Sequence, residues 1–346
     1  MQAVQFRDHG GPEVIEYGAF PDPEPARDEV LVDVKAGALN HLDLWTRRGL
    51  PGLELELPHI PGSDGAGVVE AVGADVTRFA PGDRVALAAG VSCGDCEFCR
   101  AGEPTECVSF GIIGEHSRGV HSELAAVPEA NLVPVPAGVD WPVAAAAPLV
   151  FGTAWRMLVT RAAVRPGETV LVLGASGGVG QAAVQIAAHA GATVIATGSS
   201  EAKLAHASDL GAAHGIDYEA VDLVDAVRDL TDGRGVDVVV DHVGQATWEA
   251  SLASLAKGGR LVTCGATTGP TGETDIRRLF WNQLTVYGST MATPGELDDV
   301  LALVWDGTFE PAIRAVLPMS ETVRAHELLE DREGFGKVVV VPDSEQ

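Results

Sequence analysis

Four of the five cysteines in this 346-residue chain lie between positions 93 and 107. Cys93, Cys96, Cys99 and Cys107 follow the spacing C-x2-C-x2-C-x7-C in a loop that also carries glycine and proline. Four thiolates from one short loop suit a closed tetrahedral zinc site, which holds the loop together and leaves no coordination position for a substrate. Iron–sulfur binding, redox use and disulfide bonds are the alternatives. The cluster predicts one structural Zn²⁺ per chain, in a lobe over about residues 90–110.

A glycine-rich stretch between an apolar run and a helical pattern is a second candidate site. It reads GASGGVG, and its candidate ligands for a dinucleotide are Gly174, Ser176, Gly177, Gly178, Val179 and Gly180. Gly177 lets the main chain approach a pyrophosphate, Gly180 lets the helix pack close to the strand, and the helix N-terminus supplies amide donors. The alternative is a glycine-rich turn without a ligand, since Ala175 replaces the first glycine of the common GxGxxG pattern.

The choice between NAD and NADP depends on the end of the next strand, where a carboxylate binds the ribose 2′-hydroxyl of NAD. That end, residues 197–200, carries Ser199 and Ser200 and no acidic residue, and Lys203 follows. Two hydroxyls and an ammonium could accept a 2′-phosphate, which favours NADP(H) over NAD(H). The alternative is that the serines only cap the next helix, for which serine is a preferred residue.

Two kinds of patterning position these sites. The first 130 residues hold short alternating apolar segments separated by glycine and proline, such as 29–36, 65–72 and 84–88, which is typical of a β-rich module. Strands then alternate with alanine-rich helical stretches, beginning with the apolar run at 169–174. This alternation predicts an α/β fold with a doubly wound parallel sheet. A last strand at 335–341 is expected to return to the β-rich module.

Charge and terminal sequence restrict the partners and the location. Twenty-three basic and 49 acidic residues give a formal net charge of −26, which repels nucleic acid and anionic lipid. The first ten residues carry no basic segment followed by an apolar one, and the longest apolar run, 143–155, is too short to span a bilayer. We therefore expect a cytoplasmic protein that binds neither nucleic acid nor membranes.

The chain resembles the zinc-containing alcohol dehydrogenases and quinone oxidoreductases of the medium-chain dehydrogenase/reductase superfamily over essentially its whole length. The motifs that carry the resemblance are PGSDGAGVV at 61–69, the cysteine lobe, GASGGVG, VDVVVDHVG at 236–244 and GKVVV at 336–340. The resemblance implies a GroES-like β-rich catalytic domain of residues 1–130 and 311–346. It also implies a Rossmann NAD(P)-binding domain of residues 131–310, with the active site in the cleft between the two.

The family pattern is broken where the zinc alcohol dehydrogenases hold a second, catalytic zinc with Cys, His and Cys. By motif matching these ligands fall on Asn40, on Ser63 and near Leu149. None of the three is a good zinc ligand in a site of nitrogen and sulfur donors. Leu42 also replaces the hydroxyl that relays the alcohol proton. The sequence therefore predicts no catalytic zinc.

Asn40, His41 and Asp64 are the catalytic candidates that the resemblance provides. Asn40 and the PGSD motif resemble the zinc-independent quinone oxidoreductase and enoyl reductase branch, in which NADPH delivers hydride to a conjugated carbonyl. Some members of that branch use a tyrosine as proton donor, but Trp45 stands at its position. His41 is then the candidate acid, because imidazole titrates near neutral pH; its alternatives are a cofactor-phosphate contact or a structural role.

Two acids match family carboxylates that lie behind the catalytic metal. Here Asp43 and Asp64 are expected to hold the Asn40 loop by hydrogen bonds. The alternative is an unorthodox zinc site formed by one of these acids with histidines from the nearby sequence, which are His59, His116 and His121.

Further cofactor contacts follow from the resemblance alone. Thr153 is expected to approach the nicotinamide, Val243 to border the ribose, and Gly265 to lie at the crevice edge. Lys337 resembles a family lysine on the cofactor side of the cleft; the alternative is an ordinary surface lysine.

Together these features predict an NADPH-dependent oxidoreductase that reduces a quinone, an enone or a related activated alkene and carries structural zinc only. One alternative is a zinc-dependent alcohol dehydrogenase with non-standard catalytic ligands. Another is a nucleotide-binding protein that has lost catalysis. The resemblance also implies a homodimer or homotetramer, associated through the edge strand at residues 283–290.

Overall fold

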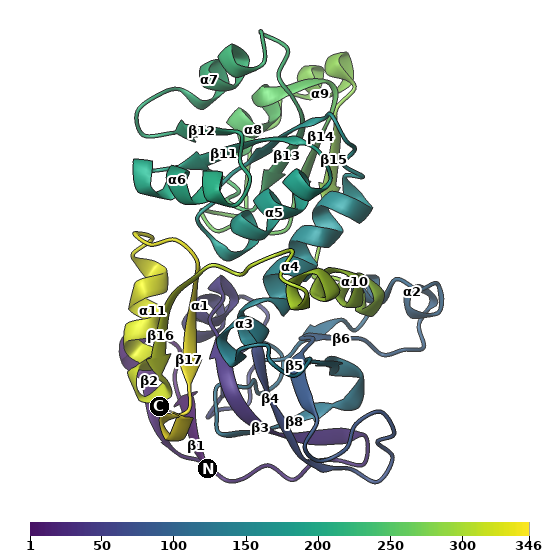
Figure 1. The fold of residues 1–346 in the computed structure, drawn as a ribbon, viewed down its shortest axis with the longest axis vertical. Coiled ribbons are helices and arrows are strands. Elements are labelled where there is room, and N and C mark those ends of the chain that lie inside the picture. The colour runs from purple at the N-terminus through teal and green to yellow at the C-terminus, as the bar shows by residue number, and fades with distance from the viewer. Residues whose placement is uncertain (346) are drawn as a thin grey trace. The chain divides into compact units, whose positions relative to one another are not determined.

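The computed structural model describes residues 1–345, which form two compact units (Figure 1). The first unit comprises residues 1–149 together with the chain from residue 293 onward, and the second comprises Val150–Ala292. The boundaries expected at residues 130 and 311 both fall inside the first unit. The reason is local packing: β9 (Leu132–Pro134) pairs with β5 (Arg84–Leu87), and α3 (Trp141–Ala146) contacts the central sheet.

A seven-stranded sheet organises the first unit. Its strand order is β16-β17-β3-β4-β5-β9, and β8 also pairs with β3. The pairings are antiparallel except for β16 with β17, and the β17–β3 pairing returns the C-terminal strand to the β-rich unit as expected. Alternate residues of β3 are buried, which agrees with the apolar alternation in its sequence.

The first unit contains these further elements. Its strands are β1 (Gln2–Phe6), β2 (Ile15–Ala19), β3 (Glu29–Ala38), β4 (Gly65–Val72), β6 (Gly90–Val91), β7 (Gly111–Ile112), β8 (Leu124–Pro128), β16 (Ile313–Pro318) and β17 (Lys337–Val341). Its helices are α1 (His41–Arg48), α2 (Glu97–Arg100), α10 (Pro294–Trp305) and α11 (Thr322–Glu330).

A parallel sheet of six strands forms the second unit. The strand order is β12-β11-β10-β13-β14-β15, with helices on both faces (Figure 1). This order places the first strand of the unit at the centre, where the direction of winding reverses, which is the arrangement of a Rossmann sheet. The predicted α/β class with a doubly wound parallel sheet is therefore confirmed.

The second unit has these bounds. Its strands are β10 (Thr169–Val172), β11 (Thr193–Gly198), β12 (His214–Asp217), β13 (Val236–Asp241), β14 (Leu255–Thr263) and β15 (Thr285–Gly288). Its helices are α5 (Gly178–His189), α6 (Glu201–Asp209), α7 (Leu223–Leu230), α8 (Trp248–Ser254) and α9 (Ile276–Asn282), while α4 (Pro148–Trp155) begins just before the unit.

Buried aliphatic side chains from the central strands and the covering helices form the core of the second unit. Leu171, Ile195, Val239 and Leu261 come from four neighbouring strands, and Val227 comes from α7. Continuous burial of strand residues on both faces explains the apolar runs seen in the sequence. Across residues 1–345, we find no helix with both the length and the apolar character that crossing a membrane requires.

Candidate active site and metal centre

Three buried polar side chains meet in the first unit at the ends of neighbouring strands. Asn40 follows β3, Asp64 precedes β4 and Lys337 opens β17. Because β3 pairs antiparallel with both β4 and β17, the end of β3 lies beside the starts of its two neighbours. Backbone pairing thus brings together residues that are as many as 297 positions apart.

These side chains form a closed hydrogen-bonded triangle. The Lys337 ammonium Nζ lies 2.5 Å from Asn40 Oδ1 and 3.0 Å from Asp64 Oδ2. Asn40 Nδ2 donates to the same Asp64 oxygen over 2.9 Å, and the Leu149 amide donates to Asp64 Oδ1 over 3.0 Å. The side chains of Lys337 and Asp64 are 3% and 0% exposed, so this is a buried ion pair.

A second buried carboxylate, that of Asp43, supports the Asn40 loop. It accepts hydrogen bonds from the Asn40 amide over 2.7 Å and from the Gly62 amide over 3.1 Å. Burial raises the pKa of Asp43 to about 6, although the backbone amides and Lys337 oppose that rise. Burial also raises the pKa of Asp64, again against the effects of Lys337 and Asn40. Both acids thus lie where sequence reasoning expected them, beside Asn40.

His41 opens helix α1 and is half-buried. Its ring centroid lies 6.3 Å from that of Trp45, one helical turn further along. His41 directly follows Asn40, one of the three residues of the buried triangle.

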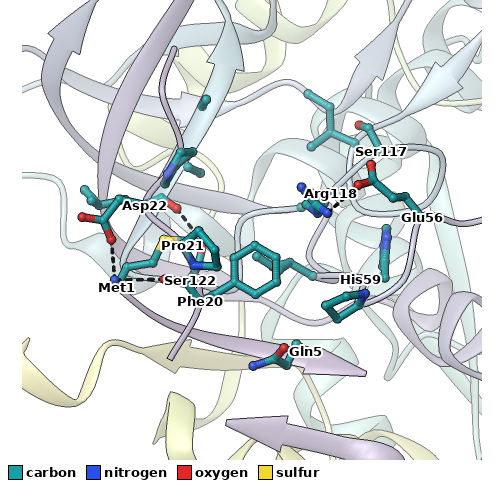
Figure 2. Close-up of a pocket in the computed structure, with 18 of the residues that line it drawn as sticks. Met1, Gln5, Phe20, Pro21, Asp22, Glu56, His59, Ser117, Arg118 and Ser122 are labelled. Carbon is teal, nitrogen blue, oxygen red and sulfur yellow. Dashed lines mark hydrogen bonds and ion pairs between the residues drawn. The ribbon is translucent and has the colours of Figure 1, made fainter. Parts of the chain in front are cut away.

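The other candidate histidines do not gather into a metal-ligand set. His59 Nε2 lies 3.1 Å from the Gly114 carbonyl oxygen. His59 also lines a cavity of about 880 Å³ together with Phe20 and Arg118 (Figure 2), and His116 is a further lining residue. His116 Nδ1 accepts a hydrogen bond from a backbone amide. Within residues 1–345, three or more metal-ligating side chains lie close together in one place, the cysteine cluster. The structure therefore gives no support to an unorthodox zinc site at His59 and His116.

The four cysteine sulfurs form a compact cluster in the loop around α2. All four Sγ atoms lie within 4.8 Å of one another. Individual Sγ–Sγ separations are 3.5 Å for Cys93–Cys107, 3.6 Å for Cys96–Cys99 and 4.0 Å for Cys93–Cys99. A tetrahedron with zinc–sulfur bonds of about 2.3 Å has edges of about 3.8 Å. The cluster therefore fits a Zn²⁺ ion, and these four residues are the ones that would hold it.

The surroundings of the cluster favour the thiolate form of Cys107 and disfavour that of Cys99. The Cys93 amide and the Ser109 hydroxyl lower the pKa of Cys107 to about 6. Burial and the neighbouring thiols raise the pKa of Cys99 to about 11. All four cysteines are free of disulfide bonds. A bound divalent cation is what allows four adjacent thiols to ionise together.

The glycine turn of the second unit joins β10 to α5. Gly174 has φ +57°, and Gly177 is the N-cap of α5. A Cβ on Gly180 would lie 2.2 Å from the Gly174 carbonyl oxygen, so only glycine permits this close helix–strand contact. Ser176, Gly178 and the following residue, Val179, complete the turn at the helix N-terminus. The geometry fits a pyrophosphate on the helix amides.

The candidate 2′-phosphate residues lie at the end of β11. Lys203 Nζ donates to Ser199 Oγ over 2.9 Å, and Ser200 Oγ accepts from the Lys203 amide over 3.4 Å. Ser200 is thus the N-cap of α6, the capping role considered from the sequence. Ser199 and the Lys203 ammonium remain together as a hydroxyl–cation pair.

Asp241 is the last residue of β13, and its carboxylate holds the turn that follows this strand. Its Oδ1 accepts from the amides of Val243 and Gly244 over 2.8 and 3.0 Å. Gly265 follows β14 beside this turn: a Cβ there would lie 3.2 Å from the His242 carbonyl oxygen. Thr153 lies separately on α4, and its buried Oγ1 finds no hydrogen-bond partner within the described part of the chain.

Sequence reasoning missed His242. Its Nε2 lies 3.0 Å from the position that a Cβ would occupy on Gly174, so the ring packs against the glycine turn. Burial lowers the pKa of His242 and favours the neutral imidazole. The available signal was its place in the 236–244 motif, directly before Val243, an expected cofactor contact.

Comparison with known proteins agrees with both units. Residues 26–137 match the alcohol dehydrogenase GroES-like domain, and residues 178–306 match the zinc-binding dehydrogenase family. A quinone oxidoreductase of Pseudomonas aeruginosa is 36% identical over 98% of this chain and 99% of its own. An acryloyl-coenzyme A reductase of Metallosphaera sedula is 34% identical, with the same coverage. A crystal structure of an NAD-dependent alcohol dehydrogenase is 47% identical and superposes with a TM-score of 0.95 over 99% of each chain.

The chain belongs to the medium-chain dehydrogenase/reductase superfamily. It is an NAD(P)-dependent oxidoreductase with a GroES-like domain and a Rossmann-like domain, as the resemblance implied. Membership also supports zinc and a nicotinamide dinucleotide as its cofactors.

The catalytic zinc of the superfamily's alcohol dehydrogenases does not fit this chain. Asn40 Oδ1 accepts from the Lys337 ammonium, and Leu149 contributes only a backbone amide to Asp64. Ser63 is fully buried and offers a hydroxyl, which is a poor zinc ligand in such sites.

Proposed function

We propose that this protein is an NADPH-dependent reductase that transfers hydride to a quinone, an enone or a related activated alkene, with zinc held only by the cysteine cluster. The observation that carries the proposal is the hydrogen bonding of Asn40, whose side chain accepts from Lys337 and donates to Asp64. An alcohol or simple carbonyl needs a Lewis acid or a strong proton donor to polarise it, whereas a conjugated acceptor is already polarised by its own π system. A site without a metal therefore suits the conjugated acceptor.

The protein's own residues position the reactants and supply a proton. The bound nicotinamide supplies the hydride, so the chain's contribution is binding, orientation and electrostatics. Asp43 and Asp64 fix the Asn40 loop from behind, and His41 stands next to Asn40 as the proposed proton donor to the reduced acceptor.

NADPH is the proposed reductant because of the end of β11. The Ser199 hydroxyl and the Lys203 ammonium lie 2.9 Å apart, where a ribose 2′-phosphate is expected. No carboxylate lies among residues 197–200 at the end of the strand; the first acidic residue after it is Glu201, in the first turn of α6. The structurally similar alcohol dehydrogenase is named as NAD-dependent, so the two cofactors must be compared directly.

A zinc-dependent alcohol dehydrogenase is the second candidate, favoured by the similarity to that same crystal structure. Metal analysis and a substrate panel separate the two. We expect one zinc per chain, NADPH oxidation with quinones and enones, a higher kcat/KM for NADPH than for NADH, and little turnover of simple aldehydes. Two zinc ions per chain with alcohol–aldehyde turnover alone would reject the proposal.

We also propose self-association through the second unit. β15 is an edge strand, and the helix before it exposes Ile276, Phe280 and Trp281, each more than 60% exposed. Pairing of β15 with a second copy would satisfy the open strand edge and cover these side chains. A homodimer or homotetramer is the expected state.

A further inference from the structure

We propose that Lys337 is the resident cation of the catalytic region, and that its ammonium takes the place of a divalent metal and excludes one. Lys337 would then be the residue that decides whether this site holds a metal. The inference rests on the proposed metal-free function and adds the reason for it.

Charge balance requires a cation at this position. The carboxylates of Asp43 and Asp64 are both 0% exposed. Buried carboxylates that lack a counter-charge are strongly destabilising. Lys337 lies in direct contact with Asp64 and also acts electrostatically on Asp43. One ammonium thus serves two buried acids, and a metal ion in addition would have no room between Asn40 Oδ1 and Asp64 Oδ2.

The fold fixes this cation in place. Lys337 is the first residue of β17, which is hydrogen-bonded on one side to β16 and on the other to β3. The Lys337 amide donates to the Ala312 carbonyl over 2.8 Å, and the Leu39 amide donates to the Val338 carbonyl over 2.9 Å. The ammonium is therefore built into the sheet rather than carried on a mobile surface chain.

A fourth buried group points to a latent ligand set. His121 is 0% exposed, and its buried ring nitrogens make no well-formed hydrogen bond within the described residues beyond an interaction with the Ala38 backbone. Its ring packs against Gly37, where a Cβ would lie 3.1 Å from His121 Nε2 and 3.6 Å from the Asp64 carbonyl oxygen. Asp64 and Lys337 both influence the His121 imidazole electrostatically. Without the ammonium, the Asp64 carboxylate and the Asn40 amide oxygen would face the vacated position, and the buried His121 imidazole is the nitrogen donor that we propose to join them.

That donor set suits a divalent ion that accepts oxygen and nitrogen ligands, such as Mn²⁺, and differs from the all-sulfur cysteine site. Mn²⁺ is therefore a probe that separates the two positions. The protein is first loaded with zinc at the cysteines, and Mn²⁺ binding is then followed by the loss of the free-ion EPR signal.

Three variants complete the experiment. Lys337→Met removes the charge but keeps most of the length of the side chain, and Lys337→Arg keeps the charge. The double variant Asp64→Asn/Lys337→Met removes the charges of both partners. We expect wild type and Lys337→Arg to bind no Mn²⁺, and Lys337→Met to bind one ion per chain. The double variant should bind it at least about tenfold more weakly. Thermal unfolding should show Mn²⁺ restoring stability to Lys337→Met but not to the double variant.

Two outcomes would overturn the inference. One is wild-type protein that binds a second metal ion, which would also remove the metal-free part of the proposed function. The other is that the Lys337→Met variant binds no Mn²⁺ and is not stabilised by added Mn²⁺. This outcome counts against the inference whether or not the variant folds without the metal. In that case the proposed function is still tested separately, by measuring NADPH oxidation by the wild-type protein with enones and quinones.

Discussion

His121 shows how burial sets the response of this protein to acid. Burial lowers the pKa of His121 to about 4, against the partly compensating effect of Asp64. An unfolded imidazole titrates near pH 6.5, so between these values the unfolded chain binds more protons than the folded chain. His121 therefore contributes stability above about pH 6.5 that is lost as the pH falls to 4, by at most about 3 kcal/mol.

The variant His121→Leu tests this effect. At pH 7.5 the side chain at position 121 is uncharged in wild type as well as in the variant. The difference between their free energies of unfolding in urea at this pH therefore measures the loss of packing alone. Between pH 6.5 and pH 4.5 the free energy of unfolding of the variant should fall less steeply than that of wild type. Parallel pH profiles would show that His121 does not titrate in this way.

His41 is the residue on which the proposed proton transfer depends. Replacement by glutamine keeps a polar side chain at the start of α1 but removes the titrating group. General acid catalysis contributes about 10²–10⁴-fold, so His41→Gln should lower kcat by about a hundredfold with an unchanged Kd for NADPH. Unchanged turnover would remove His41 from the mechanism, and a weakened Kd would assign it to cofactor binding.

The residue types of the site and the support of the Asn40 loop by Asp43 and Asp64 were readable from the sequence, but the pairing of Lys337 with Asn40 and Asp64 was not. The cysteine spacing alone predicted the cluster of four sulfurs that the structure contains. By contrast, the resemblance associated Lys337 with the cofactor, and only the structure shows its contact with Asn40. Nothing local in either segment encodes a contact across 297 positions, because it depends on the pairing of β17 with β3.

At the scale of elements, the turn between β10 and α5 depends on close contact at Gly180. A methyl group there would lie 2.2 Å from the Gly174 carbonyl oxygen, so Gly180→Ala must displace backbone. Overpacking of this kind costs about 1–3 kcal/mol. We expect a lower Tm and at least a tenfold higher Kd for NADPH, about 1.4 kcal/mol, measured by fluorescence titration.

Gly295→Ala is the matched control. Gly295 lies in α10, and no atom outside its own helix and neighbours lies within 4 Å of its added Cβ. Alanine there should stabilise the helix by about 0.5–1 kcal/mol and leave the NADPH Kd unchanged. Equal effects of the two substitutions would show that the turn imposes no special constraint.

Elements with a buried pattern were predicted well, and exposed ones were not. The strand expected at residues 65–72 coincides with β4, because its apolar residues face the core. β12 was not predicted: two of its four residues, His214 and Gly215, are exposed, and its sequence shows no apolar alternation. As an edge strand it is determined by pairing with β11, which the local sequence does not reveal.

At the scale of the whole molecule, charge distribution and association are linked to function. The chain has a net charge of −26 and only four lysines. Two of these are placed where an anion or an acid requires them: Lys203 beside Ser199 and Lys337 beside Asp64.

The proposed self-association predicts a specific effect at Trp281, whose side chain is 74% exposed on α9. Trp281→Glu should shift the protein toward monomers in light scattering after size exclusion, because it places a charge in the apolar contact. Val108→Glu, at an equally exposed position of the first unit (72%), should leave the oligomeric state unchanged. Wild-type protein that is monomeric at micromolar concentration would exclude the interface.

The central claim is that hydride goes to the β-carbon of a conjugated acceptor, and the most direct measurement is where that hydride lands. Zinc-loaded protein is incubated with a cyclic enone and NADPH deuterated at the transferring carbon, and the product is examined by NMR. We expect a saturated ketone with deuterium on the former β-carbon. An allylic alcohol with deuterium on the carbonyl carbon would contradict the account and identify an alcohol dehydrogenase.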